Sequence, residues 1–181
     1  VILTTQVSGV LPIANGGSVV KSATVTLINA QIKALPTTPV QIVAATGAGT
    51  RVKPIGVTFA LDRMAGAYTN IDATYASLQL QDPNGDWLCN PVINDSTAPG
   101  IADLTAFLNS GGSTYPVVDV LPMFLNASSL GWTQSVMTTD AASLDNTRVD
   151  IALGNNGSGN LTGGNAANTL KVTVYYVTEA I

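Results

Sequence analysis

The feature that most constrains the fold is a series of short, alternating segments rich in β-branched residues and separated by turns. ATVTLI at 23–28 and TLKVTVYYVT at 169–178 repeat with the two-residue period of a strand. Similar segments cover residues 39–45, 51–62, 73–81, 116–126, 130–137 and 147–153. About eight strands with a turn signal at roughly every tenth residue are typical of an all-β sandwich or barrel, not of βαβ units.

We therefore predict an all-β fold: an antiparallel β-sandwich, most specifically a jelly roll with two four-stranded sheets. A fibronectin-like sandwich is the open alternative. Residues 1–22 are interpreted as an extended N-terminal arm, and residues 23–181 as a single β-sandwich domain. One short helix is expected inside a long connection, where Ile101, Leu104, Phe107 and Leu108 have helical spacing.

Several local features carry more detailed expectations. Residues 29–35 suit one helical turn opened by Asn29 as its cap and stopped by Pro36. Pro54 indicates an edge position or a bulge near the start of its strand. In residues 73–81, the side chains of Ser77, Gln79 and Gln81 are expected on a solvated face. DPNG at 82–85 is a turn signal, TGAGT at 46–50 is interpreted as a hairpin turn, and residues 154–168 as a surface loop.

Charge is scarce, and this bears on the class of partner. Charged residues make up 10% of the chain, against about 25% in ordinary soluble domains. The seven Lys and Arg residues form no cluster and the net charge is −4, so a footprint for nucleic-acid phosphates is missing. Thr, Ser, Asn and Gly must cover the surface instead, which favours protein–protein contact. No apolar run is long enough for a membrane span, which takes about 20 residues.

The chain is also poor in catalytic side chains. It has no His, its one Glu is Glu179, and its one Cys is Cys89. A nucleophilic cysteine needs a basic partner such as His, so Cys89 is interpreted as a small buried hydrophobic residue. We predict no enzyme. A hydrolase built on two Asp residues stays open, although the spacing of Asp140, Asp145 and Asp150 singles out no pair.

Two motifs look like ligand sites and fail on spacing. TGAGTRVK at 46–53 is too short for a phosphate-binding loop and lies between two predicted strands. Asp82, Asn84 and Asp86 resemble the opening of a calcium loop, but Ile93 stands where its final Glu belongs. We therefore predict no cofactor and no metal.

Two regions are candidates for contact with other proteins. The N-terminal arm carries Val7, Val10, Leu11 and Ile13 at irregular spacing and has no covering layer of its own. It therefore packs either on a neighbouring molecule or on its own domain. Trp87 follows the polar turn at 82–85, which favours a contact role over a core role for this side chain.

Three segments resemble a group of small virion proteins of tailed bacteriophages. They are IKALPTTPVQIVAATGAGTRVKPIGVTFALD at 32–62, AYTNIDATYASLQLQ at 67–81 and GNLTGGNAANTLKVTVYYV at 159–177, in the same order as in that group. Members read IKALxxTPxxLVAAPGAGK, AYTN and NLTGGxGTLKVTVYY. This chain departs from the pattern at Thr46, where Pro is usual, and at Thr50, where Lys is usual.

The resemblance implies a structural role on the virion and no catalytic residues. It implies a capsid decoration (cement) protein that is made in the bacterial host cytoplasm and binds the major capsid protein on the outer shell, often as a trimer. The alternative is a receptor- or glycan-binding module associated with a tail or fibre, which would stack exposed Trp or Tyr side chains on sugars.

Overall fold

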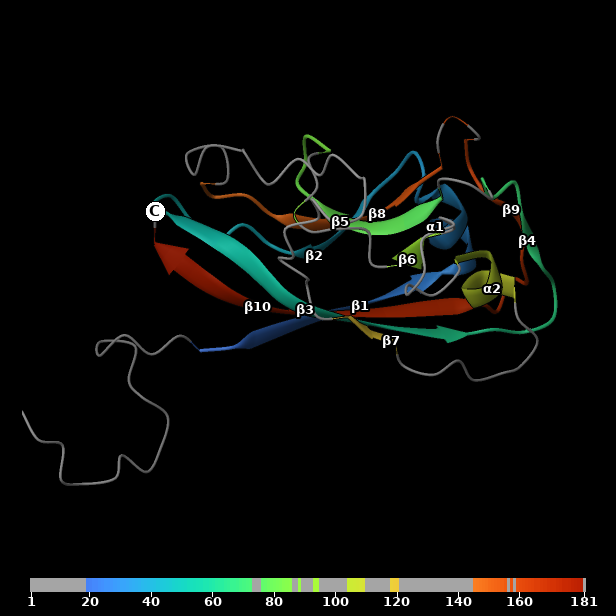
Figure 1. Ribbon diagram of the computed structural model, residues 1–181, viewed down its shortest axis with the longest axis horizontal. Helices are drawn as coiled ribbons and strands as arrows, with labels where there is room; N and C mark the ends of the chain where they lie inside the picture. The colour runs from blue at the N-terminus through green and yellow to red at the C-terminus, as the bar shows by residue number, and fades with distance from the viewer. Residues whose placement is uncertain are drawn as a thin grey trace, which may run out of the picture.

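The computed structural model describes residues 19–72, 76–85, 88, 93–94, 104–109, 118–120, 145–155, 157 and 159–180. Within them the chain forms antiparallel strands and two short helices, which confirms the predicted all-β class. Two layers of strands face each other, with the helices towards one end (Figure 1).

The first layer, sheet A, has the strand order β1-β10-β3-β7. Its members are β1 (Lys21–Ile28), β10 (Thr169–Ala180), β3 (Thr50–Asp62) and β7 (Val118–Val120). β1 begins at Lys21, two residues before the predicted start of the domain at residue 23. The last long strand of the described chain, β10, therefore lies at the centre of the sheet, between β1 and β3.

The second layer, sheet B, has the order β2-β8-β5-β6. It consists of β2 (Val40–Val43), β8 (Val149–Gly154), β5 (Ser77–Gln81) and β6 (Ile93–Asn94). A separate two-stranded sheet pairs β4 (Tyr68–Thr69) with β9 (Thr162–Gly163). β9 lies inside the segment 154–168 that we had expected to be a surface loop, so that expectation is wrong for Thr162 and Gly163.

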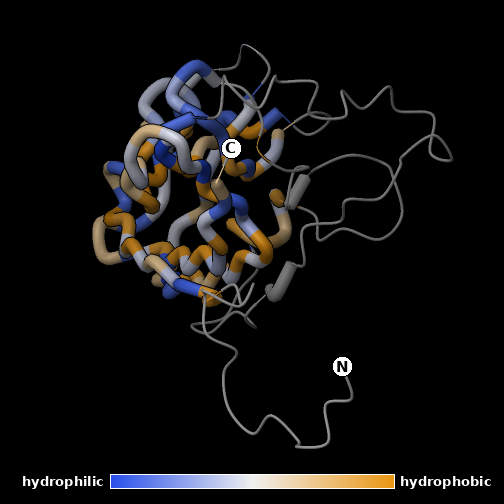
Figure 2. The backbone as a smooth tube through the Cα atoms, turned by 90° about the vertical axis from the view of Figure 1, so that its left-hand side faces the viewer, coloured by the Kyte–Doolittle hydropathy of each residue, from blue (hydrophilic) through white to orange (hydrophobic). Residues whose placement is uncertain are grey.

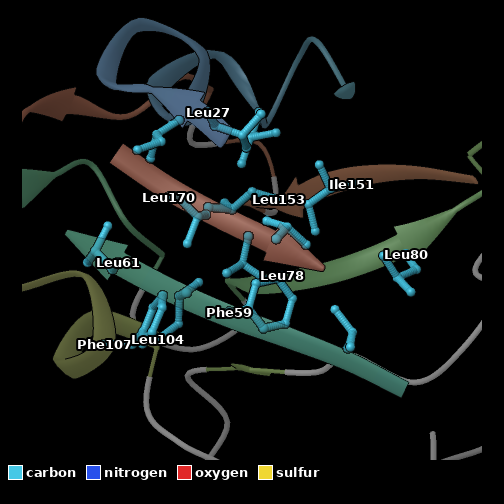
Figure 3. Close-up of a cluster of buried hydrophobic side chains, with 14 of the residues drawn as sticks. Leu27, Phe59, Leu61, Leu78, Leu80, Leu104, Phe107, Ile151, Leu153 and Leu170 are labelled. Carbon is cyan, nitrogen blue, oxygen red and sulfur yellow. The ribbon is translucent and has the colours of Figure 1, made fainter. Parts of the chain in front are cut away.

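One hydrophobic core fills the space between the sheets. Leu27, Phe59 and Leu170 project from sheet A, and Leu78, Ile151 and Leu153 meet them from sheet B (Figure 3). The alternation of apolar and polar residues along the strands is visible in the hydropathy colouring (Figure 2). Alternating side chains point to opposite faces of a strand, which is why each long strand of sheet A has one buried and one accessible side.

The short helix α2 (Leu104–Asn109) confirms the helix predicted in the long connection. Leu104, Phe107 and Leu108 are buried on one side of it, and the Phe107 ring meets Phe59 edge-on at a centroid distance of 6.5 Å. A second helix, α1 (Asn29–Ala34), replaces the single turn expected there. Asn29 is not its cap: the Gln31 Oε1 atom accepts a hydrogen bond from the backbone N–H of Ile28 at 3.1 Å, and Asn29 is buried as the first helical residue.

The bulge predicted near Pro54 is present. Gly56 lies opposite Tyr175 and Pro54 opposite Tyr176, so Ile55 has no residue across from it. Proline has no N–H to give to a ladder, and the bulge places it where the regular pairing is already interrupted.

The segment TGAGT does not form the expected hairpin turn, because β2 and β3, which flank it, lie in different sheets. Turn chemistry fixes the local path of the chain but not which strands pair. By contrast, the turn at 82–85 is confirmed: the backbone N–H of Asn84 donates to the Asp82 Oδ1 atom at 2.9 Å.

Candidate interaction surfaces

The residues predicted to form interfaces, Val7, Val10, Leu11, Ile13 and Trp87, all lie outside the described residues. The contact roles of the arm and of Trp87 stay predictions. The described residues do contain five polar arrangements, which differ in whether they serve the fold or face outward.

The first arrangement surrounds Tyr68, whose ring is buried at one end of the sandwich. The Asn109 side chain accepts a hydrogen bond from the Tyr68 N–H at 2.7 Å and donates to the Tyr68 carbonyl at 2.8 Å, as a neighbouring strand would. Asn168 donates to the phenolic oxygen at 3.2 Å. Burial raises the pKa of the Tyr68 phenol, although the Asn168 hydrogen bond and the positive charge of Arg63 oppose the shift.

A second group of asparagines continues this network. The Asn155 amide donates to the carbonyls of Asn70 at 2.9 Å and Gly159 at 2.7 Å. Asn160 accepts from the Thr37 hydroxyl at 2.7 Å, and its carbonyl accepts from the Asn70 amide at 2.8 Å. We call this set the asparagine network; its members are Asn70, Asn109, Asn155, Asn160 and Asn168.

The asparagine network explains what the three resembling segments do in the fold. Residues of 32–62, 67–81 and 159–177 meet there, and the Leu161 N–H also donates to the Lys33 carbonyl at 3.0 Å. Sequence reasoning missed this role because the partners lie up to 123 residues apart. The available signal was the density of Asn around the short YT and TG segments. The network ties the α1 end of the sandwich together and is structural.

The TGAGT loop is held by a second polar arrangement. The backbone N–H groups of Gly47 and Gly49 donate to the side chains of Asn146 at 2.9 Å and Asp145 at 2.7 Å. The two N–H groups that a phosphate would use are thus already bonded to side chains of this chain.

The third arrangement lies on β5 and β8 and overturns an expectation. Ser77, Gln79 and Gln81 were expected on a solvated face, but all three are buried. The Gln79 amide donates to the Gln81 side-chain oxygen at 3.1 Å. Beside them lies Asp150, which is 1% exposed. Its carboxylate accepts a hydrogen bond from the Arg148 Nε atom at 2.9 Å. The alternation correctly grouped these side chains on one face, but it carries no information about what covers that face.

Charged side chains gather at the far end of β3 and β10. The Glu179 carboxylate forms salt bridges with the Arg51 Nη2 atom at 2.8 Å and with the Lys53 Nζ atom at 3.0 Å. The hydrogen bond from Lys53, and then that from Arg51, lowers the pKa of Glu179 below its usual range. This is the opposite of the raised carboxyl pKa that a general acid requires. The cluster fastens the end of β10 to β3.

The fifth arrangement faces outward and is the candidate contact surface. On the side of sheet A away from the core, Thr24, Thr173 and Thr58 lie in one row across three strands. The hydroxyls of Thr24 and Thr173 are 2.9 Å apart. We call this side the threonine face and define it by Ser22, Thr24, Thr26, Thr58, Lys171, Thr173 and Tyr175. Lys171 is the one charged residue of this set, and Tyr175 is 41% exposed. The exposed Asp62 lies opposite Thr169, on the same side of the sheet at the end of β3.

Ligand and membrane features are limited in the part of the chain that the structure describes. No group of three His, Cys, Asp or Glu side chains there could hold a metal ion. Neither described helix, at six residues each, has the length and apolar character for crossing a membrane.

Comparison with known proteins finds no match for the chain: no family model, no curated protein and no solved structure is significantly similar to it. The resemblance to phage virion proteins therefore stays a prediction.

Proposed function

We propose that this protein is a capsid decoration (cement) protein of a tailed bacteriophage. In this proposal it binds the major capsid protein on the outer shell, gathers there as trimers and stabilises the particle through protein–protein contacts. The observation that carries the proposal is the threonine face: an accessible sheet surface whose seven defining residues include one charge, Lys171, on a body held together by a continuous core.

A surface with few charges costs little free energy of desolvation when a protein partner covers it. Interface centres are depleted in charged residues, because a charge buried without a partner is strongly unfavourable. Threonine hydroxyls can exchange bonds with water for bonds with a partner. β10 and β3, which are paired on both sides, also lose little conformational freedom on binding, which favours affinity.

We also propose that the sandwich is a jelly roll, and the strand order supports this. When the short strands β4 and β9 are left out and the others are numbered along the chain, sheet A reads 1-8-3-6 and sheet B reads 2-7-4-5. The first and last strands are then neighbours, and so are the second and seventh. This nesting is what winding two Greek keys into a double-sheet jelly roll produces.

The test is co-sedimentation of the purified protein with expanded phage capsid shells that lack it. We expect saturable binding at a fixed ratio to the major capsid protein, and that ratio identifies the symmetry site. Thr173→Glu places a charge at the centre of the threonine face and should weaken binding about tenfold or more, which corresponds to about 1.4 kcal/mol.

The matched control is Ala166→Glu, because Ala166 is exposed in the turn before β10 and lies off the threonine face. It should bind as the unmodified protein does. Equal loss in both variants would remove the threonine face from the proposal. No binding to shells at any salt concentration or temperature would contradict the decoration role and favour the tail or fibre module, for which a glycan array is the next assay.

A further inference from the structure

One edge of β1 has no partner among the strands that the structure describes. Among the described strands β1 pairs with β10 alone, so alternate N–H and C=O groups point outward along its eight residues. Edge strands are normally protected by proline, by a bulge or by inward-pointing charges. β1 contains no proline, pairs with β10 without a shift of register, and has a single charge, Lys21, at its first residue.

Exposed apolar side chains mark the two ends of this edge. Val20, immediately before β1, is 57% exposed, and Ile28, its last residue, is 55% exposed. Among the described large apolar side chains these two are the most exposed. Both have even numbers, so the two-residue period places them on the same side as Ser22, Thr24 and Thr26, which is the threonine face.

We propose that β1 pairs antiparallel with β1 of a second copy, about a twofold axis at Thr24. In this register Val20 lies opposite Ile28 of the second copy, and the same contact occurs again by symmetry. Thr24 lies opposite Thr24, and Ser22 opposite Thr26. Lys21 lies opposite Leu27, so no like charges face each other. The two A sheets then form one continuous eight-stranded sheet.

The occupant is a second copy because β1 is its own complement. An antiparallel partner must bring an apolar residue to each end of the edge on the threonine face, and β1 itself does so. A slip of two residues in either direction separates Val20 from Ile28, so one register is preferred.

Pairing of a single edge covers less than the roughly 1,600 Å² of a standard interface, so association should be weak and concentration-dependent. The contact does not depend on a capsid shell and is separate from a threefold contact. It would join one trimer to the next.

Disulfide crosslinking tests the register in solution, in a Cys89→Ser background and with oxidised glutathione as the oxidant. Directly opposed Cβ atoms lie about 4.5–5.5 Å apart, close to disulfide range, whereas positions four residues out of register are about 13 Å apart. Thr24→Cys should therefore form covalent dimer at least about tenfold faster than Ser22→Cys or Thr26→Cys alone. A mixture of the last two variants should crosslink efficiently.

A second measurement needs no cysteine. Sedimentation of the unmodified chain should show association that rises with concentration, and Val20→Lys should abolish it by placing a lysine opposite Ile28. Met64→Lys is the control, because Met64 is 47% exposed but follows the end of β3 and is not part of the β1 edge, and it should leave association intact. Equal crosslinking rates at all three positions, or association that survives Val20→Lys, would overturn the proposal.

Discussion

Replacement of Gly164 by alanine should be among the most damaging single-methyl changes in the described chain. Gly164 has φ +68°, and a Cβ atom there would lie 2.5 Å from the Tyr68 Cε1 atom and 2.6 Å from the Asn29 Oδ1 atom. The left-handed backbone costs alanine about 1–2 kcal/mol, and overpacking a well-filled site adds about 1–3 kcal/mol. We therefore expect Gly164→Ala to lower the free energy of unfolding by about 2–5 kcal/mol.

Gly49→Ala is the matched control, because Gly49 has φ +77° but nothing within 4 Å of its would-be Cβ. It should show only the backbone cost. Urea unfolding followed by circular dichroism measures both variants, and the melting temperature should fall by about 2–4 °C for each kcal/mol lost. Equal losses in the two variants would refute the packing argument. Combination with Tyr68→Leu should also be less than additive, because the smaller side chain relieves part of the overlap.

Two further predictions concern charge. Glu179→Gln should reduce stability at pH 7 by about 0.5–1 kcal/mol. Because Lys53 and Arg51 lower the pKa of Glu179 in the folded state, their stabilisation is present above the ordinary value of 4.5 and is lost as the pH falls through the folded-state pKa. Urea titrations from neutral to acidic pH should show the gap closing, and a constant gap would contradict this account. Arg148→Met should lower stability more than Glu179→Gln does, because it removes the cation from Asp150, whose side chain is 2% exposed. Thermal unfolding should show that Asp150→Leu recovers much of this loss in the double variant, and an additive double loss would contradict the ion-pair account.

Local pattern was sufficient for the strands whose two faces differ. β10 and β3 alternate clearly, and the structure places Leu170, Val172, Val57 and Phe59 inside, as the two-residue period requires. The helix at Leu104–Asn109 followed from spacing in the same way, because its three buried residues recur at helical intervals. The bulge near Pro54 followed from the missing N–H of proline.

Features that depend on distant parts of the chain were not accessible to that reasoning. Gln79 and Gln81 were placed on the correct face of β5, but the burial of that face depends on packing between segments. The TGAGT loop was recognised as a turn, yet its flanking strands pair in different sheets. The Asn109 side chain acts as a strand partner for Tyr68 across 41 positions, and no periodicity within either segment signals such a contact.

The central place of β10 has a consequence for synthesis of the protein on the ribosome. β1 and β3 are synthesised before β10, and both pair with β10 in the folded sheet. The paired residues of β1 and β10 are about 150 positions apart in the sequence, as Lys21 and Tyr176 are. Contacts so distant in sequence slow folding, because the chain must close a long loop before the contact contributes any stability. A nascent chain that lacks residues 169–180 leaves β1 without its partner strand and β3 paired with β7 alone among the described strands. We therefore expect chaperone dependence and aggregation to concentrate in chains that are truncated or stalled before β10 emerges.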